Sequence, residues 1–125
     1  MNDEERSAAG LRTRREVLGD AHVDRAVAGA SEFTAPFQDL ITRYAWGEIW
    51  NRPGLSRPER SMITLAMLAA LGREEELALH VRAARRNGLT DAQIAEVLLQ
   101  VAIYAGIPAA NRAFAVASQV LAGIS

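Results

Sequence analysis

Cysteine and lysine are both absent from this 125-residue chain, whose 14 basic residues are all arginine. Without cysteine there can be no disulfide exchange, no thiolate nucleophile and no cysteine-ligated metal. Without lysine no Schiff base can form with a carbonyl substrate or with pyridoxal phosphate. The two histidines, His22 and His80, are too few for a histidine-rich zinc or iron site. Any catalysis must therefore rely on arginine, carboxylates and one or two imidazoles.

An excess of charge of either sign is also missing, since 14 basic and 15 acidic residues give a net charge of −1. Such a chain lacks the positive field that holds nucleic acid or an anionic membrane. No apolar run reaches the ~20 residues that cross a bilayer, and the first ten residues are acidic and polar, unlike a signal peptide. We therefore expect a cytoplasmic protein with no nucleic-acid or membrane partner.

The chain has the length and composition of one globular domain over residues 1–125, with half of its residues hydrophobic and 23% charged. Helix signals recur along it, including the capping boxes that begin at Ser56 and Thr90 and the helix-ending glycines Gly72 and Gly88. The expected helical segments are 4–18 (an N-terminal helix or arm within 1–18), 22–31, 34 to the stop at Pro53-Gly54, 56–71, 74–87, 90 to Gly106, and 108–121. No strand pattern occurs, so we predict an all-α domain of five to seven helices.

Two of the expected helical segments contain more apolar residues than one buried helix face requires. The body of the segment 56–71 is apolar on nearly every side, so we expect that helix to be central. The segment 101–121 is rich in small apolar residues, which predicts subunit contacts. A tightly packed core within a single chain is the alternative interpretation.

His80 is the most informative single residue. Leu77, Val81 and Ala84 surround it at helical spacing, so His80 borders the expected buried stripe. Glu76 lies one turn earlier, where its carboxylate can orient or charge the imidazole. A histidine in this place is either a satisfied core residue or a proton donor, and spacing alone leaves both open.

A second concentration of chemistry lies at the end of the helix that precedes Pro53. Trp46, Glu48, Trp50 and Arg52 fall within seven residues, and Tyr44 comes just before them. An arginine beside indole rings can bind a carboxylate, because the guanidinium pairs with both oxygens. The alternative is a helix end with aromatic core anchors and solvent-facing charges.

Arg57 and Arg60 flank the capped start of the following helix, a non-specific setting for an anion. Arg60 precedes Thr64 by one turn and is expected to point inward, whereas Arg57 is expected to face solvent. No glycine-rich phosphate loop, nucleophile elbow or metal-ligand spacing occurs.

Four stretches resemble the 4-carboxymuconolactone decarboxylase family, and the resemblance extends from about Arg14 to Leu121. They are GDAHVDRA (19–26), FQDLITRYAWGEIWNRPGLSR (37–57), RSMITLAMLAALGREEELALHVRAARRNGLT (60–90) and EVLLQVAIYAGIPAANRAF (96–114). The resemblance implies an alkyl hydroperoxidase D-like helical fold, a homo-oligomer (hexamer or trimer), no cofactor and no metal. It also implies decarboxylation of a small lactone dicarboxylate to an enol-lactone in protocatechuate catabolism by the β-ketoadipate pathway.

Peroxidases of the same superfamily carry a glutamate, a Cys-x-x-Cys pair and a histidine separated from the second cysteine by three residues. Placing that histidine on His80 puts the cysteine positions at Arg73 and Glu76 and the glutamate position at Ser61. The chain keeps the histidine and lacks the redox pair, so peroxidase chemistry is excluded.

The implied reaction needs a proton donor. We assign His80 to this role, with Glu48 or Glu76 as its orienting or proton-relay partner, and His22 as a weaker candidate donor. Two other functions stay open, namely a non-catalytic helical oligomer or small-ligand binder, and an acid–base enzyme acting on a related lactone or β-keto acid.

The reaction also needs a hold on the substrate. Arg52 or Arg60 is expected to bind the acetate arm, while Trp46, Trp50 and Tyr44 provide an apolar wall for the departing carboxylate. The lactone ring itself can accept the electron pair, so that neither a lysine nor a metal is required.

Overall fold

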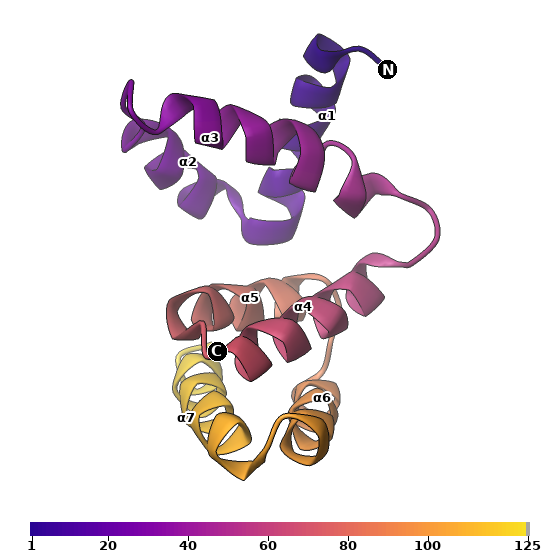
Figure 1. The fold of residues 1–125 in the computed structure, drawn as a ribbon, viewed down its shortest axis with the longest axis vertical. Helices are drawn as coiled ribbons and strands as arrows, with labels where there is room; N and C mark the ends of the chain where they lie inside the picture. The colour runs from indigo at the N-terminus through magenta and orange to yellow at the C-terminus, as the bar shows by residue number, and fades with distance from the viewer. Residues whose placement is uncertain (125) are drawn as a thin grey trace. The chain divides into compact units, whose positions relative to one another are not determined.

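The computed structural model describes residues 1–124, and all of the regular structure in that part of the chain is helical (Figure 1). Seven α-helices are present among these described residues, which confirms the predicted all-α class of five to seven helices. The chain forms two compact units, Met1–Leu55 and Ser56–Ser125.

The first unit consists of α1 (Asp3–Leu18), α2 (Asp20–Ala28), α3 (Ala35–Leu40), a π-helix η1 (Ile41–Trp46) and a 3-10 turn η2 (Ile49–Asn51). Gly19, with φ of 93°, ends α1 and begins α2, so α2 starts two residues before the predicted segment 22–31. The single helix expected from residue 34 to Pro53 is instead divided among α3, η1 and η2. Apolar spacing shows which side chains face a core, but it does not show whether an amide bonds to the fourth or the fifth preceding carbonyl.

Two glycines allow α1 and η1 to meet backbone to backbone. A Cβ on Gly10 would lie 1.9 Å from the Thr42 carbonyl oxygen, and one on Gly47 would lie 2.4 Å from the carbonyl oxygens of both Arg6 and Arg43. Atoms cannot approach this closely, so both positions require the absence of a side chain.

The second unit consists of α4 (Arg57–Leu71), α5 (Glu74–Arg86), α6 (Asp91–Tyr104) and α7 (Ile107–Ala122). The predicted capping boxes are confirmed, since Ser56 accepts a hydrogen bond from the Glu59 amide and Thr90 from the Gln93 amide. Gly72, with φ of 71°, follows α4 as predicted. Local capping chemistry therefore sets these boundaries.

These four helices enclose one core. Helix α5 packs against α4 and α7, and α6 packs against the same two helices (Figure 1). The buried core residues are Leu65, Ala69, Leu77, Val81, Ala84, Leu89, Ile94, Leu98, Val101, Ala113, Ala117 and Val120. Helix α4 contacts the other three helices of the unit, as expected of a central helix, although Ile63, Met67 and Leu71 are 43%, 53% and 68% exposed in the single chain.

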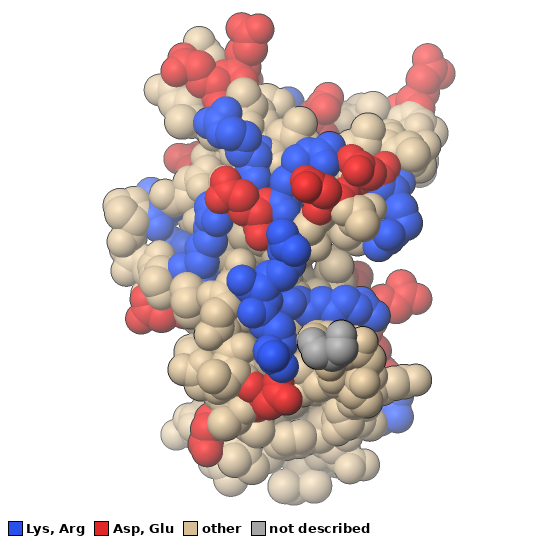
Figure 2. All heavy atoms as spheres, turned by 180° about the vertical axis from the view of Figure 1, so that it is seen from behind, with Lys and Arg blue, Asp and Glu red and all other residues tan. Residues whose placement is uncertain are grey.

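Arginine side chains lie among carboxylates on the surface. Figure 2 shows arginine side chains at the surface with acidic side chains beside them. In the first unit Arg15 pairs with Asp20 and Asp24 at 3.1 and 2.9 Å, and in the second Arg85 pairs with Asp91. None of the helices among residues 1–124 has the length and hydropathy needed to cross a membrane.

Candidate functional site

The aromatic segment of the first unit is held in place by partly buried hydrogen bonds of Asn51. Trp46 is 6% exposed and stacks on Trp50, with ring centroids 5.1 Å apart and an interplanar angle of 26°. The Asn51 side-chain amide donates to the carbonyl oxygens of Trp46 and Gly47 at 3.0 and 3.3 Å. Its oxygen accepts a 2.7 Å hydrogen bond from the hydroxyl of buried Thr13 on α1. These bonds fix the indole pair against α1.

Charged groups surround the exposed side of this segment. Glu48 lies 3.7 Å from Nε of Arg6. The Arg6 and Arg43 guanidinium groups lie 5.3 and 5.7 Å from the centroid of the Tyr44 ring, which is within cation–π range. Arg52 follows η2 and is exposed. The first unit thus brings Tyr44 and Glu48, which the sequence singled out, together with Arg6 and Arg43, which it did not. The placement of Arg52 beside the indole rings stays a prediction.

His80 and Arg60 belong to the second unit. His80 lies half-buried on α5 beside the buried residues Leu77, Val81 and Ala84, as its spacing predicted. Arg60 is also half-buried, and its carbonyl oxygen accepts a 2.8 Å hydrogen bond from the Thr64 hydroxyl. The partnership of His80 with Glu48, which belongs to the first unit, stays a prediction.

A buried polar contact also links α4 to α5. The Asn87 side-chain amide donates to the hydroxyl of Ser61 at 2.9 Å, and Ser61 is 1% exposed. Asn87 follows His80 by seven residues, which is two helical turns, and Ser61 is the neighbour of Arg60 in the chain. The bond therefore fixes the register between the helix that carries the histidine and the helix that carries the arginine. Sequence reasoning did not single out either of its residues as a contact.

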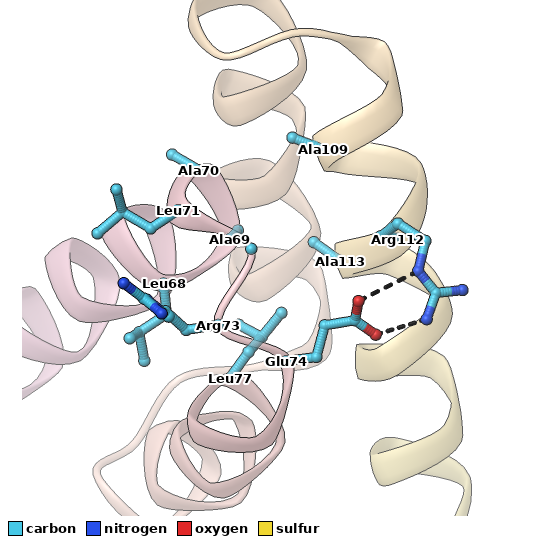
Figure 3. A pocket seen from close by; sticks show the side chains of 11 residues that line it. Leu68, Ala69, Ala70, Leu71, Arg73, Glu74, Leu77, Ala109, Arg112 and Ala113 are labelled. Atoms are coloured by element: carbon cyan, nitrogen blue, oxygen red, sulfur yellow. Dashed lines mark hydrogen bonds and ion pairs between the residues drawn. The ribbon is translucent and has the colours of Figure 1, made fainter.

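A cavity of about 190 Å³ lies where the end of α4, the start of α5 and α7 meet (Figure 3). Arg112 donates from Nη2 and Nε to the two carboxylate oxygens of Glu74, at 2.5 and 3.4 Å. These hydrogen bonds hold the pKa of Glu74 below its usual value and raise that of Arg112. Glu74, in the first turn of α5, thereby joins α5 to α7. The pair neutralises its own charge, and Arg73 is the remaining charged residue in the lining of this cavity.

Metal ligands do not gather in either unit. Within residues 1–124, no three histidine, aspartate or glutamate side chains are arranged so that they could hold an ion. Both histidines instead lie on helices, His22 on α2 and His80 on α5.

The surroundings of the half-buried His22 disfavour its protonated form. Burial, followed by the positive charges of Arg14 and Arg25, lowers the pKa of His22 below its usual 6.5. A histidine with a lowered folded-state pKa resists protonation while the unfolded chain accepts the proton. Its contribution to stability is therefore complete above pH 6.5 and is lost as the pH falls toward the folded-state pKa.

We expect the free energy of unfolding to fall between pH 7.5 and pH 5.0, and to fall less in the His22→Gln variant. Urea titrations at the two pH values measure the decrease for each protein, and subtracting the decrease of the variant removes what the other titratable groups contribute. An equal decrease in the free energy of unfolding for both proteins would show that folding does not lower the pKa of His22.

Comparison with known proteins identifies the family of this chain. The carboxymuconolactone decarboxylase family model matches residues 35–119, which include the aromatic segment, Arg60 and His80. The chain belongs to the carboxymuconolactone decarboxylase family. This membership confirms the resemblance found in the sequence, and the family's fold is the alkyl hydroperoxidase D-like helical fold.

Two relatives of this chain match it over most of its length. The 4-carboxymuconolactone decarboxylase of Acinetobacter baylyi is 49% identical over 120 residues, which are 96% of this chain and 90% of that protein. The nitrosuccinic acid decarboxylase of Metarhizium robertsii is 41% identical over 112 residues, which are 90% of this chain and 78% of that protein. The names of both relatives describe loss of a carboxylate from a small acid.

Proposed function

We propose that this chain catalyses the decarboxylation of 4-carboxymuconolactone to 3-oxoadipate enol-lactone in protocatechuate catabolism by the β-ketoadipate pathway. The observation that carries the proposal is the 49% identity to the Acinetobacter baylyi enzyme over 96% of the chain. Family membership over residues 35–119 supports it. The absence of cysteine and lysine agrees with chemistry that needs neither a thiolate nor a Schiff base.

The substrate supplies its own electron sink. The carbon that bears the departing carboxylate is joined to the ring carbonyl through a carbon–carbon double bond. Breaking the bond to the carboxylate therefore releases CO₂ and moves the electron pair through the double bond onto the lactone carbonyl oxygen. Protonation of the resulting dienolate at the α carbon gives the enol-lactone. The protein's task is to hold the carboxylates, stabilise the developing oxyanion and deliver one proton.

We assign proton delivery to His80, with Glu48 or Glu76 as its orienting partner and His22 as the weaker alternative. A positioned general acid contributes roughly 10²–10⁴-fold, and a hydrogen-bond donor at a developing oxyanion about 3–4 kcal/mol. The half-buried position of His80 on α5 supports the assignment, because the ring can reach both the core and a ligand.

We assign the acetate arm of the substrate to Arg52 or Arg60. The stacked rings of Trp46 and Trp50, with Tyr44 nearby, suit an apolar wall against which a carboxylate loses its charge as CO₂. Water excluded by such a wall cannot stabilise the negative charge of the ground state, which favours its departure.

A second candidate substrate follows from the Metarhizium robertsii relative, whose name describes a nitrosuccinic acid decarboxylase. A nitro group accepts an electron pair as the lactone carbonyl does, so one site can serve either reaction. The test compares kcat/KM for 4-carboxymuconolactone and 2-nitrosuccinate with the same purified protein. A higher value for the lactone supports our proposal, a higher value for nitrosuccinate replaces it, and no turnover of either favours the non-catalytic alternative.

We further propose that the protein is a cytoplasmic homo-oligomer, a hexamer or trimer, without a nucleic-acid partner. An apolar cavity of about 330 Å³ on α4 and α6 supports the oligomer, with Met67, Ala70 and Tyr104 among its lining residues. Nearby Ile103 is 77% exposed and Tyr104 is 82% exposed. Monomeric proteins rarely expose an apolar area of this kind, and a second copy of the chain would cover it.

The Met67→Glu variant is expected to dissociate into species of at most half the wild-type mass, because it would bury a charge between subunits. Light scattering after gel filtration gives the mass. Ala92→Glu places the same charge in the first turn of α6 and is expected to leave the mass unchanged. A wild-type protein with the mass of a single chain, or an unchanged mass in Met67→Glu, would contradict this interface.

A further inference from the structure

The first unit contains a cavity of about 260 Å³ that lies outside the residues assigned above. Helix α1, helix α2 with the residues that follow it, and α3 with the start of η1 surround the cavity. Its lining residues are Ser7, Leu11, Arg14, Ala26, Val27, Ala30, Ala35, Gln38, Asp39 and Thr42. The cavity is slightly smaller than typical pockets for drug-sized ligands, so it suits a small molecule.

Arg14 is the charged side chain buried in this cavity. It is only 7% exposed, and its Nη1 donates to the side-chain oxygen of Gln38 at 3.1 Å. Within residues 1–124, its Nε has no hydrogen-bond partner, and no carboxylate lies within ion-pair distance of its guanidinium. Its near neighbours on α1 differ, since Arg6 and Arg15 both have aspartate partners.

A buried guanidinium with one neutral partner is an unsatisfied arrangement. Guanidinium stays protonated in proteins and carries five donors in a fixed plane, while burial of a charge is costly unless it is paired. Burial lowers the pKa of Arg14, and its charge helps to lower the pKa of His22. Arg14 and Asp39 are the charged residues that line the cavity. The group that satisfies an arginine fork best is a carboxylate.

We propose that the cavity around Arg14 binds a small organic carboxylate, with the guanidinium of Arg14 as its main contact. The apolar side chains of Leu11 and Val27 suit the carbon body of such a ligand. Resting on the function proposed above, the ligand is a small dicarboxylate of the substrate's class, bound at a place other than the one assigned to catalysis, and Arg14 holds one of its carboxylates. Asp39 also lines the cavity and is exposed, so its negative charge weakens the binding of an anion.

Adipate, a saturated and unreactive six-carbon dicarboxylate, is the probe for this site, and its diamide is the uncharged control. Calorimetry on the full chain is expected to detect adipate and not the diamide. Arg14→Gln is expected to weaken adipate binding roughly 10- to 100-fold, as loss of a charged hydrogen-bond pair does. Asp39→Asn is expected to tighten it. Arg12→Gln, an exposed arginine on the same helix that does not line the cavity, is expected to leave it unchanged.

A second measurement needs no variant. Because the charge of Arg14 helps to lower the pKa of His22, an adipate carboxylate on Arg14 should raise that pKa, which NMR titration of the imidazole follows. A His22 pKa that saturating adipate does not move would overturn the proposal even if Arg14→Gln fails to fold. Unchanged adipate affinity in a folded Arg14→Gln would overturn it as well. A lower oligomer mass in Arg14→Gln, without adipate binding to the wild type, would instead assign a subunit contact to Arg14.

The outcomes separate this proposal from the function. Adipate binding that depends on Arg14, without turnover of 4-carboxymuconolactone, would keep the site and reject the function. Turnover with unchanged kcat/KM and unchanged adipate affinity in Arg14→Gln would keep the function and reject the site.

Discussion

Replacing His80 with alanine is expected to lower kcat for 4-carboxymuconolactone by roughly 10²–10⁴-fold. The dienolate formed by loss of CO₂ must be protonated at carbon, and the chain offers only His80 and His22 as imidazole donors. His80 is half-buried on α5 beside the second unit's core, so removing the ring leaves no donor in its place. Initial rates with saturating substrate measure kcat, and KM is expected to change less.

Three further variants test whether the loss of kcat is due to proton transfer by His80. His80→Gln keeps a hydrogen-bond donor but cannot transfer a proton, so it should be nearly as slow as alanine. Arg82→Ala, on an exposed part of the same helix, should retain full turnover. His22→Gln should also retain most of it. Full activity in a folded His80→Ala protein would remove the central residue of the mechanism, and a large loss in His22→Gln would move the donor there.

The partner of His80 can be assigned in the same assay. Glu48 is exposed in the first unit, with Arg6 near its carboxylate, and Glu76 is exposed in the first turn of α5. If Glu48 relays the proton, Glu48→Gln lowers kcat and Glu76→Gln does not. The reverse pattern would assign the partner to Glu76.

Replacing Gly10 with alanine is expected to destabilise the first unit by about 3 kcal/mol or more, at the upper end of the range for overpacked sites. The new Cβ would lie 1.9 Å from the Thr42 carbonyl oxygen, and backbone atoms cannot move aside as a flexible side chain can. Helix α1 must therefore separate from η1. Trp46 and Trp50 both lie in the first unit, so urea unfolding followed by tryptophan fluorescence reports on this unit directly.

Gly54→Ala is the matched control, because a Cβ there meets nothing within 4 Å. Its unfolding midpoint is expected to stay close to that of the wild type. If Gly10→Ala unfolds at the same urea concentration as Gly54→Ala, then α1 does not pack on η1 as described.

The sequence predicted the second unit closely because its helix ends are local. The Ser56 and Thr90 capping boxes and the glycines Gly72 and Gly88 act within a few residues of the boundaries that they set. In the first unit the prediction failed where a distant segment decides the conformation. The π-helix at Ile41–Trp46 lies against α1, and no pattern within residues 34–53 reports that contact.

The polar contacts that hold the candidate sites were missed for the same reason. Thr13 and Asn51 lie 38 residues apart, as do Glu74 and Arg112, while Ser61 and Asn87 lie 26 apart. A single sequence carries no spacing rule for pairs so far apart.

By contrast, the position of His80 beside a buried stripe followed from helical periodicity alone. The unpaired burial of Arg14 could not be predicted, because an arginine among polar neighbours on a weakly patterned helix is usually exposed.

The central claim is that this chain releases CO₂ from 4-carboxymuconolactone with its own side chains. The most direct test measures CO₂ and 3-oxoadipate enol-lactone together, using protein purified and assayed with a strong chelator present. We predict one CO₂ for each enol-lactone formed, at a rate that the chelator does not change. Consumption of the lactone without CO₂, or activity that disappears with the chelator and returns with added metal, would contradict the account.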